Sequence, residues 1–247
     1  MTLGETFRAA AICDRVSIVL FWVVATLSAL LLLFESFLAS IVQPILIIAA
    51  IAGIGIGIAT TLLQTRGNSL LRESQLSNSL GASIGDAVRP DYYNNDLPSS
   101  LGRLAATTLE NTLHTLRVLS HMLWRERTVT LVYLILFVLL MASRWTSLPW
   151  LLLLAQTLFS TEVALRWLRM ERFSFRTKQV HNRLRQFFQQ GGKTKTPNGI
   201  ALALATFTDY ECAKDEAALP LDSKTFDKLN PSVSAEWDEM RRKLNIS

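Results

Sequence analysis

The sequence lacks the residue patterns that mark most enzymes, secreted proteins and metal-binding proteins. Its 247 residues include only three histidines and two cysteines, Cys13 and Cys212. Two cysteines so far apart provide neither a disulfide framework nor a metal site with closely spaced thiols. Walker loops and the HExxH and GxSxG motifs, which serve phosphate binding and hydrolysis, are also absent from the sequence. We therefore expect no enzymatic activity, no metal and no cofactor.

Charge is nearly missing from two parts of the chain, which excludes a soluble protein with one central core. Half of the residues are hydrophobic, and the mean hydropathy is +0.28. The apolar runs at residues 16–34 and 41–63 are long enough, at about 1.5 Å per residue, to cross a hydrocarbon core of roughly 30 Å. Two shorter runs, at residues 128–143 and 149–165, need tilt or help from flanking residues to cross.

The positions of the basic residues predict the orientation in the lipid bilayer. Arg8 and Arg15 precede the first run, as in a signal peptide, but the run is too long for one and a second run follows it. Of the 25 Lys and Arg residues, only Arg144 lies in a loop of the two apolar hairpins. By the positive-inside rule, both termini are cytoplasmic. This distribution explains the net charge of +5, so no nucleic acid partner is expected.

We therefore predict an all-α, multi-pass protein of the cell inner membrane, with four transmembrane helices in two hairpins and helical cytoplasmic extensions. A segment rich in glycine, with a proline and an Asn-Gly pair, predicts a flexible linker before the tail. The expected parts are an N-terminal transmembrane hairpin (1–65), a cytoplasmic helical region (66–127) with a loop at 81–98, a second transmembrane hairpin with a basic helical extension (128–190), the linker (191–199) and a C-terminal cytoplasmic helical tail (200–247).

Apolar residues at steps of three or four predict an amphipathic helix in the central cytoplasmic region. The stripe consists of Leu101, Ala105, Leu109, Leu113, Leu116, Leu119 and Leu123. Asp96 or Ser99 is expected to cap this helix, which continues without a break into the third span. The fourth span is likewise expected to continue into the basic stretch after Arg166. The tail is too short to be stable alone, so it is expected to dock on this bundle or on another subunit.

Two sets of residues in the spans are candidates for packing. Ala49, Gly53 and Gly57 lie four apart on one face, where small residues let helix backbones approach closely. This face serves either packing within the monomer or contacts in a homo-oligomer, and both remain open. Glu162 and Arg166, also four apart, are expected to form an ion pair at the membrane interface.

Two polar sets in the cytoplasmic region are candidate binding sites. Glu110, His114, Arg117 and His121 share a helical face that suits a divalent metal, although a solvated polar face explains them more simply. The central loop offers tyrosine rings for stacking and side chains that donate directionally, a set that suits a base or a nucleotide, unless the loop only caps the next helix. These loop residues are Arg89, Asp91, Tyr92, Tyr93, Asn94 and Asn95.

The motifs DYYNN at residues 91–95 and LENTLHT at 109–115, together with residues 210–237 of the tail, resemble those of four-span proteins that accompany bacterial anti-phage and mobile-element cassettes. The whole arrangement is similar to that of four-transmembrane effectors associated with nucleotide second-messenger synthases. The resemblance implies an oligomeric protein that is triggered in the cytoplasm, by a nucleotide signal or a protein partner, and perturbs the inner membrane in anti-phage defence.

Two other functions remain open. One is a membrane-anchored scaffold or binding module that recruits a soluble partner through residues 199–247. The other is a small transporter, which is disfavoured because no span carries a charge at its centre.

Overall fold

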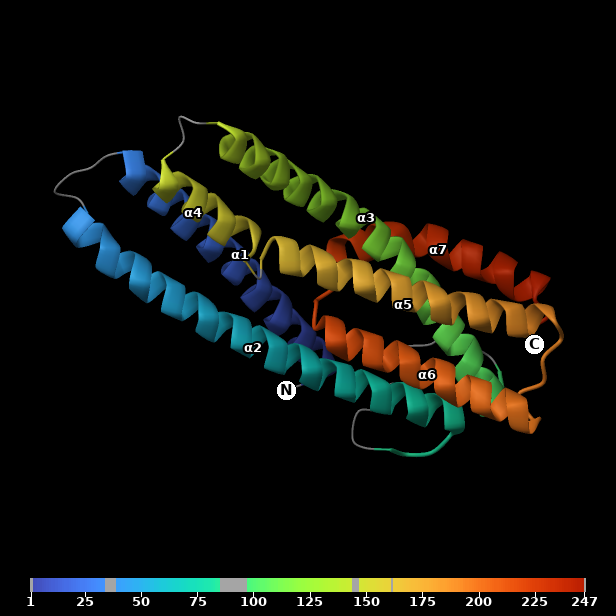
Figure 1. The fold of residues 1–247 in the computed structure, drawn as a ribbon. Coiled ribbons are helices and arrows are strands. Elements are labelled where there is room, and N and C mark those ends of the chain that lie inside the picture. Colours follow the sequence, from blue (N-terminus) through green and yellow to red (C-terminus); the bar gives the residue numbers. More distant parts are fainter. Residues whose placement is uncertain (1, 34–38, 85–96, 144–146, 161, 247) are drawn as a thin grey trace.

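The computed structural model describes residues 2–33, 39–84, 97–143, 147–160 and 162–246. These ranges contain seven helices and no strand, so the all-α prediction is confirmed (Figure 1). The helices are α1 (Leu3–Leu33), α2 (Ala39–Leu80), α3 (Leu101–Ala142), α4 (Leu148–Leu158), α5 (Ala164–Gln189), α6 (Pro197–Ala217) and α7 (Ser223–Lys243).

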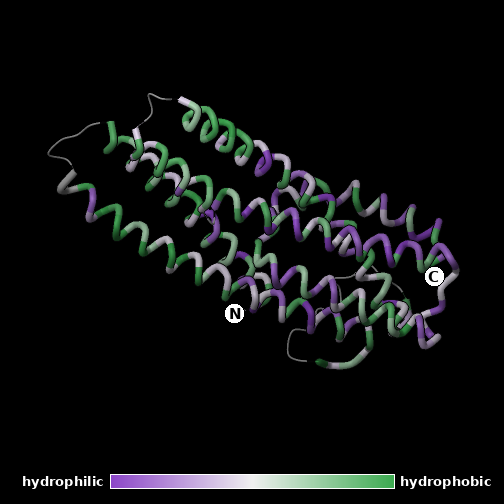
Figure 2. The backbone as a smooth tube through the Cα atoms, viewed as in Figure 1, coloured by the Kyte–Doolittle hydropathy of each residue, from purple (hydrophilic) through white to green (hydrophobic). Residues whose placement is uncertain are grey.

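The helices α2 and α3 are the longest, with 42 residues each, and both run along most of the molecule (Figure 1). Hydrophobic residues gather at one end and hydrophilic residues at the other (Figure 2). We call the first the apolar end, which consists of residues 16–33, 42–63, 128–142 and 148–158. The second is the polar bundle, which consists of α5, α6 and α7 with residues 64–80 of α2 and 101–127 of α3.

Among the described residues, two helices are long and apolar enough to cross a membrane: α1, and α2 from Val42 onward. Only 6% of the most apolar window of each helix is buried, so neither window lies in the core of this chain. Of the four expected transmembrane helices, only the two of the N-terminal hairpin therefore meet this requirement in the described part of the chain. In α3 the uninterrupted apolar run begins only after Arg127, and α4 has 11 residues, which correspond to about 16 Å.

The predicted continuous helix from the fourth apolar run into the basic stretch is wrong, because the chain breaks between α4 and α5. Hydroxyl side chains near the break bond back to the main chain, a local alternative to helix continuation. The Thr157 hydroxyl donates to the carbonyl of Leu153 over 2.8 Å, and the Ser160 hydroxyl donates to that of Thr157 over 2.7 Å. After the break, Arg166 of α5 lies next to the apolar end, where it is buried.

The structure corrects several predicted helix limits. The N-cap of α3 is Ser100, whose hydroxyl accepts from the Arg103 amide over 3.2 Å, rather than Asp96 or Ser99. Helix α6 already begins at Pro197, with Thr196 as its cap. Helix α7 begins at Ser223, and the side chain of Asp222 caps it.

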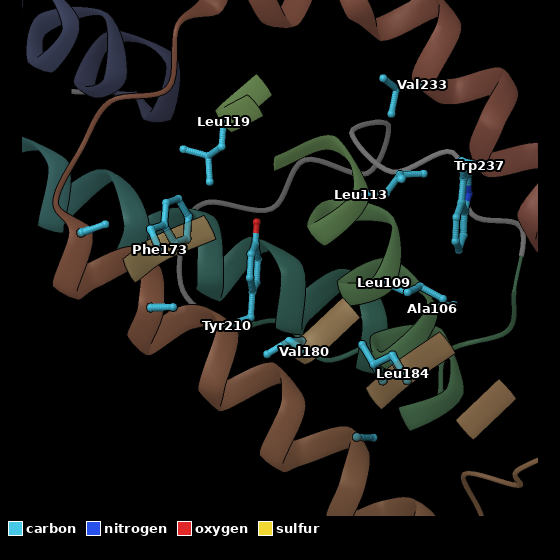
Figure 3. Close-up of a cluster of buried hydrophobic side chains, with 14 of the residues drawn as sticks. Ala106, Leu109, Leu113, Leu119, Phe173, Val180, Leu184, Tyr210, Val233 and Trp237 are labelled. Carbon is cyan, nitrogen blue, oxygen red and sulfur yellow. The ribbon is translucent and has the colours of Figure 1, made fainter. Parts of the chain in front are cut away.

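The core of the polar bundle forms where α3 meets α5, α6 and α7 (Figure 3). Much of the predicted apolar stripe of α3 is buried in this core. Leu109 and Leu119 of the stripe are fully buried. Across from it lie Phe173 of α5, Tyr210 of α6 and Trp237 of α7. The tail therefore docks on its own chain, and its aromatic side chains complete the core.

Helix α2 joins the polar bundle through hydrogen bonds instead of apolar contacts. Gln75, which is fully buried, donates to the Thr108 hydroxyl over 3.3 Å and accepts from the Asn111 amide over 3.1 Å. Further toward the apolar end, Asn68 and Arg72 donate to the two carboxylate oxygens of Asp215 over 2.9 and 3.1 Å. These polar contacts attach α2 to α3 and α6.

Candidate functional site

A buried guanidinium lies where the apolar end meets the polar bundle. Arg166, in the first turn of α5, is only 6% exposed. Two of its nitrogens donate to the two carboxylate oxygens of Asp14 on α1, over 2.8 and 3.0 Å. This forked geometry is the strongest form of an arginine–carboxylate pair. It joins residues that are 152 positions apart in the sequence.

Two further carboxylates surround the same guanidinium. Glu126 of α3 lies 3.7 Å from Nε of Arg166, and Glu162, just before α5, lies 3.9 Å from Nη1. The Ser17 hydroxyl of α1 donates to Glu162 over 3.3 Å. We call Arg166 with Asp14, Glu126 and Glu162 the arginine cluster. It connects α1, α3 and α5, so it links the apolar end to the polar bundle.

The predicted pair of Glu162 and Arg166 is present, but it is the longest of the three contacts. Sequence reasoning missed Asp14 and Glu126, because spacing along one helix cannot reveal partners on other helices. One signal was available: both residues lie just outside an apolar run, as Arg166 does.

Burial and charge act against each other in this cluster. Burial lowers the pKa of the Arg166 guanidinium, but the hydrogen bonds to Asp14 and the three carboxylate charges outweigh it, so the net shift is upward. Burial also raises the pKa of the Glu126 carboxyl, against the opposing charge of Arg166. The neighbouring Arg169 has a lowered pKa, because it is buried and lies near the positive charge of Arg166.

Two cavities border the arginine cluster, and both are lined by Asp14, Glu162 and Arg166. The large cavity, of about 590 Å³, extends between α1 and α2 into the apolar end. The small cavity, of about 300 Å³, extends toward α3 and the start of α7. The cluster thus contributes to the walls of both cavities.

The small-residue face of α2 lies on the large cavity. Ala49, Gly53 and Gly57 all line it, together with Leu20 of α1. A Cβ atom on Gly53 would lie 3.6 Å from the Leu20 side chain, whereas one on Gly57 would meet nothing within 4 Å. These residues therefore face α1 within the same chain and leave space beside it.

The candidate ligand residues of the central loop, Arg89 to Asn95, lie outside the described residues. The described residues on either side of this loop connect the end of α2 to the start of α3 by hydrogen bonds. The amide of Ser100 donates to the carbonyl of Ser79 over 2.8 Å, and Arg103 donates to Asn78 over 3.3 Å.

Helix α7 contacts part of the polar face of α3 that carries Glu110, His114, Arg117 and His121. Arg117 donates to Glu236 over 3.0 Å, and the ring of His114 lies 5.7 Å from that of Phe226. Within the described ranges, no three histidine, cysteine or acidic side chains converge as metal ligands. Glu110 and His114 are partly buried beside α7, whereas Arg117 and His121 remain exposed, so half of this face is solvated.

Two buried titratable groups in the polar bundle shift stability with pH in opposite directions. Burial, followed by the charge of Asp238, raises the pKa of Glu110 to about 7, and one of its carboxyl oxygens has no hydrogen-bond partner. Burial, followed by the charge of Arg185, lowers the pKa of His181 to about 4, and its Nδ1 lies 3.1 Å from the Thr112 hydroxyl. At neutral pH His181 is therefore uncharged.

Replacing Glu110 with glutamine is expected to stabilise the protein at high pH only. Between pH 4.5 and about 7 the folded state holds a proton on Glu110 that the unfolded state has released, so stability falls as pH rises. His181 has the opposite effect on stability, which rises with pH between about pH 4 and 6.5. The wild type and Glu110→Gln are therefore compared at the same pH, so that the contribution of His181 cancels. The advantage of Glu110→Gln in unfolding free energy should grow by about 3 kcal/mol from pH 4.5 to pH 8.

Chemical denaturation at the two pH values measures this change. The matched control is Glu239→Gln, because Glu239 is exposed and pairs with Lys243. The control should differ from the wild type by nearly the same amount at both pH values. An equal change in both variants would contradict the assignment to Glu110.

Comparison of the chain with protein-family models, curated proteins and solved structures finds no match. The interpretation of function therefore depends on the geometry described above. The main elements of this geometry are an apolar end with exposed side chains, a folded polar bundle and a buried arginine cluster that connects the two.

Proposed function

We propose that the chain is a non-enzymatic, multi-pass protein of the cell inner membrane whose cytoplasmic bundle controls a membrane-embedded unit. The apolar end is the membrane unit, and the polar bundle is the cytoplasmic control domain. On receiving a cytoplasmic trigger, the protein perturbs the membrane as an oligomeric effector or channel-like protein. Anti-phage defence is the setting that the resemblance implies.

The exposed apolar surface supports the membrane placement. Ile47, Ile48, Ile51 and Ile54 of α2 are each more than 60% exposed, and α1 carries Val19 and Leu33 at 62%. A soluble monomer rarely leaves so large an apolar surface in water. The shorter apolar parts of α3 and α4 lie at the same end of the molecule (Figures 1 and 2). We propose that they form a second hairpin beside α1, with local thinning of the bilayer and snorkelling of flanking residues compensating for their short length.

The arginine cluster is the observation that carries the control function. A trigger that moves α5 changes the distance from Arg166 to Asp14 and thereby acts directly on α1, and a trigger that moves α3 changes the distance from Arg166 to Glu126. Because a buried charge without its partner is costly, the cluster favours one arrangement of these helices strongly. A cluster of this kind, between the membrane unit and the control domain, suits a two-state device. The loop at 89–95 and the homo-oligomer stay predictions within this proposal.

Membrane potential in expressing cells tests the proposal. We expect Arg166→Gln and the nearly isosteric Asp14→Asn to release the membrane unit, so that induced cells lose potential and grow slowly without any trigger. The control is Arg172→Gln, since Arg172 is exposed and pairs with Glu216 on the bundle surface. Variants that reach the membrane in wild-type amounts and leave the potential unchanged would contradict the control function.

A further inference from the structure

We propose that the large cavity binds one zwitterionic phospholipid, with an acyl chain between α1 and α2 and the headgroup at the arginine cluster. This inference rests on the membrane placement proposed above. The volume of about 590 Å³ falls within the range of roughly 300–1,000 Å³ that is typical of small-molecule sites.

The wall of the cavity suits a hydrocarbon chain. Most of it consists of apolar side chains and small residues from the two helices of the first hairpin. They include Leu20, Phe21, Val24, Ala49, Gly53 and Ile54. Because Gly57 carries no side chain and a Cβ there would meet nothing within 4 Å, the cavity remains open along α2. An acyl chain can fill such a space without losing any hydrogen bond.

The base of the cavity suits a headgroup that carries both charges. Among the described residues that line the cavity, Asp14 and Glu162 are acidic, and Arg166 and Arg169 are basic. Ser17, Thr60 and Thr61 add hydroxyls. Two charges of each sign favour a phosphate and an ammonium group together over a group of one sign.

The positions of the two arginines indicate where the phosphate lies. Arg166 faces three carboxylates, and the pKa of Arg169 is lowered because burial and the positive charge of Arg166 together outweigh the charges of Glu162 and Asp14. A phosphate beside Arg169 would offset both effects. The ammonium group would then lie toward Glu162, which is held by the Ser17 hydroxyl.

A pair of glycine substitutions tests the site. Gly57→Leu places a side chain in the cavity, and Gly55→Leu places the same side chain two residues away, at an exposed position that does not line it. The proteins are purified in detergent, incubated with phosphatidylethanolamine or phosphatidylglycerol, and examined by native mass spectrometry. The wild type and Gly55→Leu should retain one phosphatidylethanolamine, and Gly57→Leu should retain it at least tenfold less.

A second variant tests the headgroup contact without filling the cavity. Arg169→Gln should still retain one lipid but lose the preference for phosphatidylethanolamine. Equal retention by the two leucine variants, no retained lipid on the wild type, or preferential retention of phosphatidylglycerol would overturn the proposal. The readout is bound lipid on purified protein, so these results leave the tests of membrane potential unaffected. Thermal unfolding of each variant shows whether loss of lipid merely reflects loss of fold.

Discussion

Replacing Arg166 with glutamine is expected to lower the free energy of unfolding by about 3–5 kcal/mol, because it leaves buried carboxylates without their partner. Asp14, Glu126 and Glu162 have side chains that are only 15–17% exposed. Water can therefore compensate them only in part. Denaturation of the purified protein in detergent measures the effect.

The control for this variant is Arg172→Gln, which removes a guanidinium from the same helix. Its side chain is 71% exposed and pairs with Glu216, so the expected loss is below about 1 kcal/mol. Adding Asp14→Asn to Arg166→Gln should cost less than the two single effects together, by about 0.5–3 kcal/mol. Strictly additive effects would mean that the two residues are not coupled.

Replacing Trp237 with alanine is expected to cost about 3–5 kcal/mol and to release α7 from the bundle. This side chain is 3% exposed and packs among apolar residues of the bundle core. No nearby side chain is expected to fill the space that the indole leaves, because cores relax only partly around a cavity. Limited proteolysis and denaturation should both show the loss, with early cleavage within α7.

The matched control is Trp124→Ala on α3, where the indole is 75% exposed. Its effect on stability should stay within about 0.5 kcal/mol in detergent. Equal losses for the two variants would show that the tail does not complete the core.

The sequence predicted the helices well where one periodic pattern decided the outcome. The apolar stripe of α3 predicted a helix from about 99 to 143, and α3 extends from Leu101 to Ala142. The break between α4 and α5 could not be predicted in the same way, because no glycine or proline marks it in the sequence. Apolar composition over that stretch favours a single helix.

The site was harder to predict than the fold, because its residues come together only in three dimensions. Glu162 and Arg166 were found by their spacing, but Asp14 is the closest partner and lies on α1. The part of α2 that joins the polar bundle, residues 64–80, is also mostly polar, so no apolar stripe predicted which of its side chains are buried. Gln75 nevertheless becomes one of the most deeply buried side chains, because Thr108 and Asn111 satisfy its amide.

The central element of the proposed function is that the apolar parts of all four helices cross the membrane while the polar bundle stays in the cytoplasm. Labelling with a membrane-impermeant maleimide on intact spheroplasts tests it most directly. The protein carries Cys13→Ala and Ser147→Cys, and the native Cys212 is the internal reporter. Ser147 is an exposed residue before α4, and Cys212 is exposed on α6. We predict labelling at position 147 in intact spheroplasts and at Cys212 only after lysis. Labelling of Cys212 in intact spheroplasts, or of position 147 only after lysis, would contradict the account.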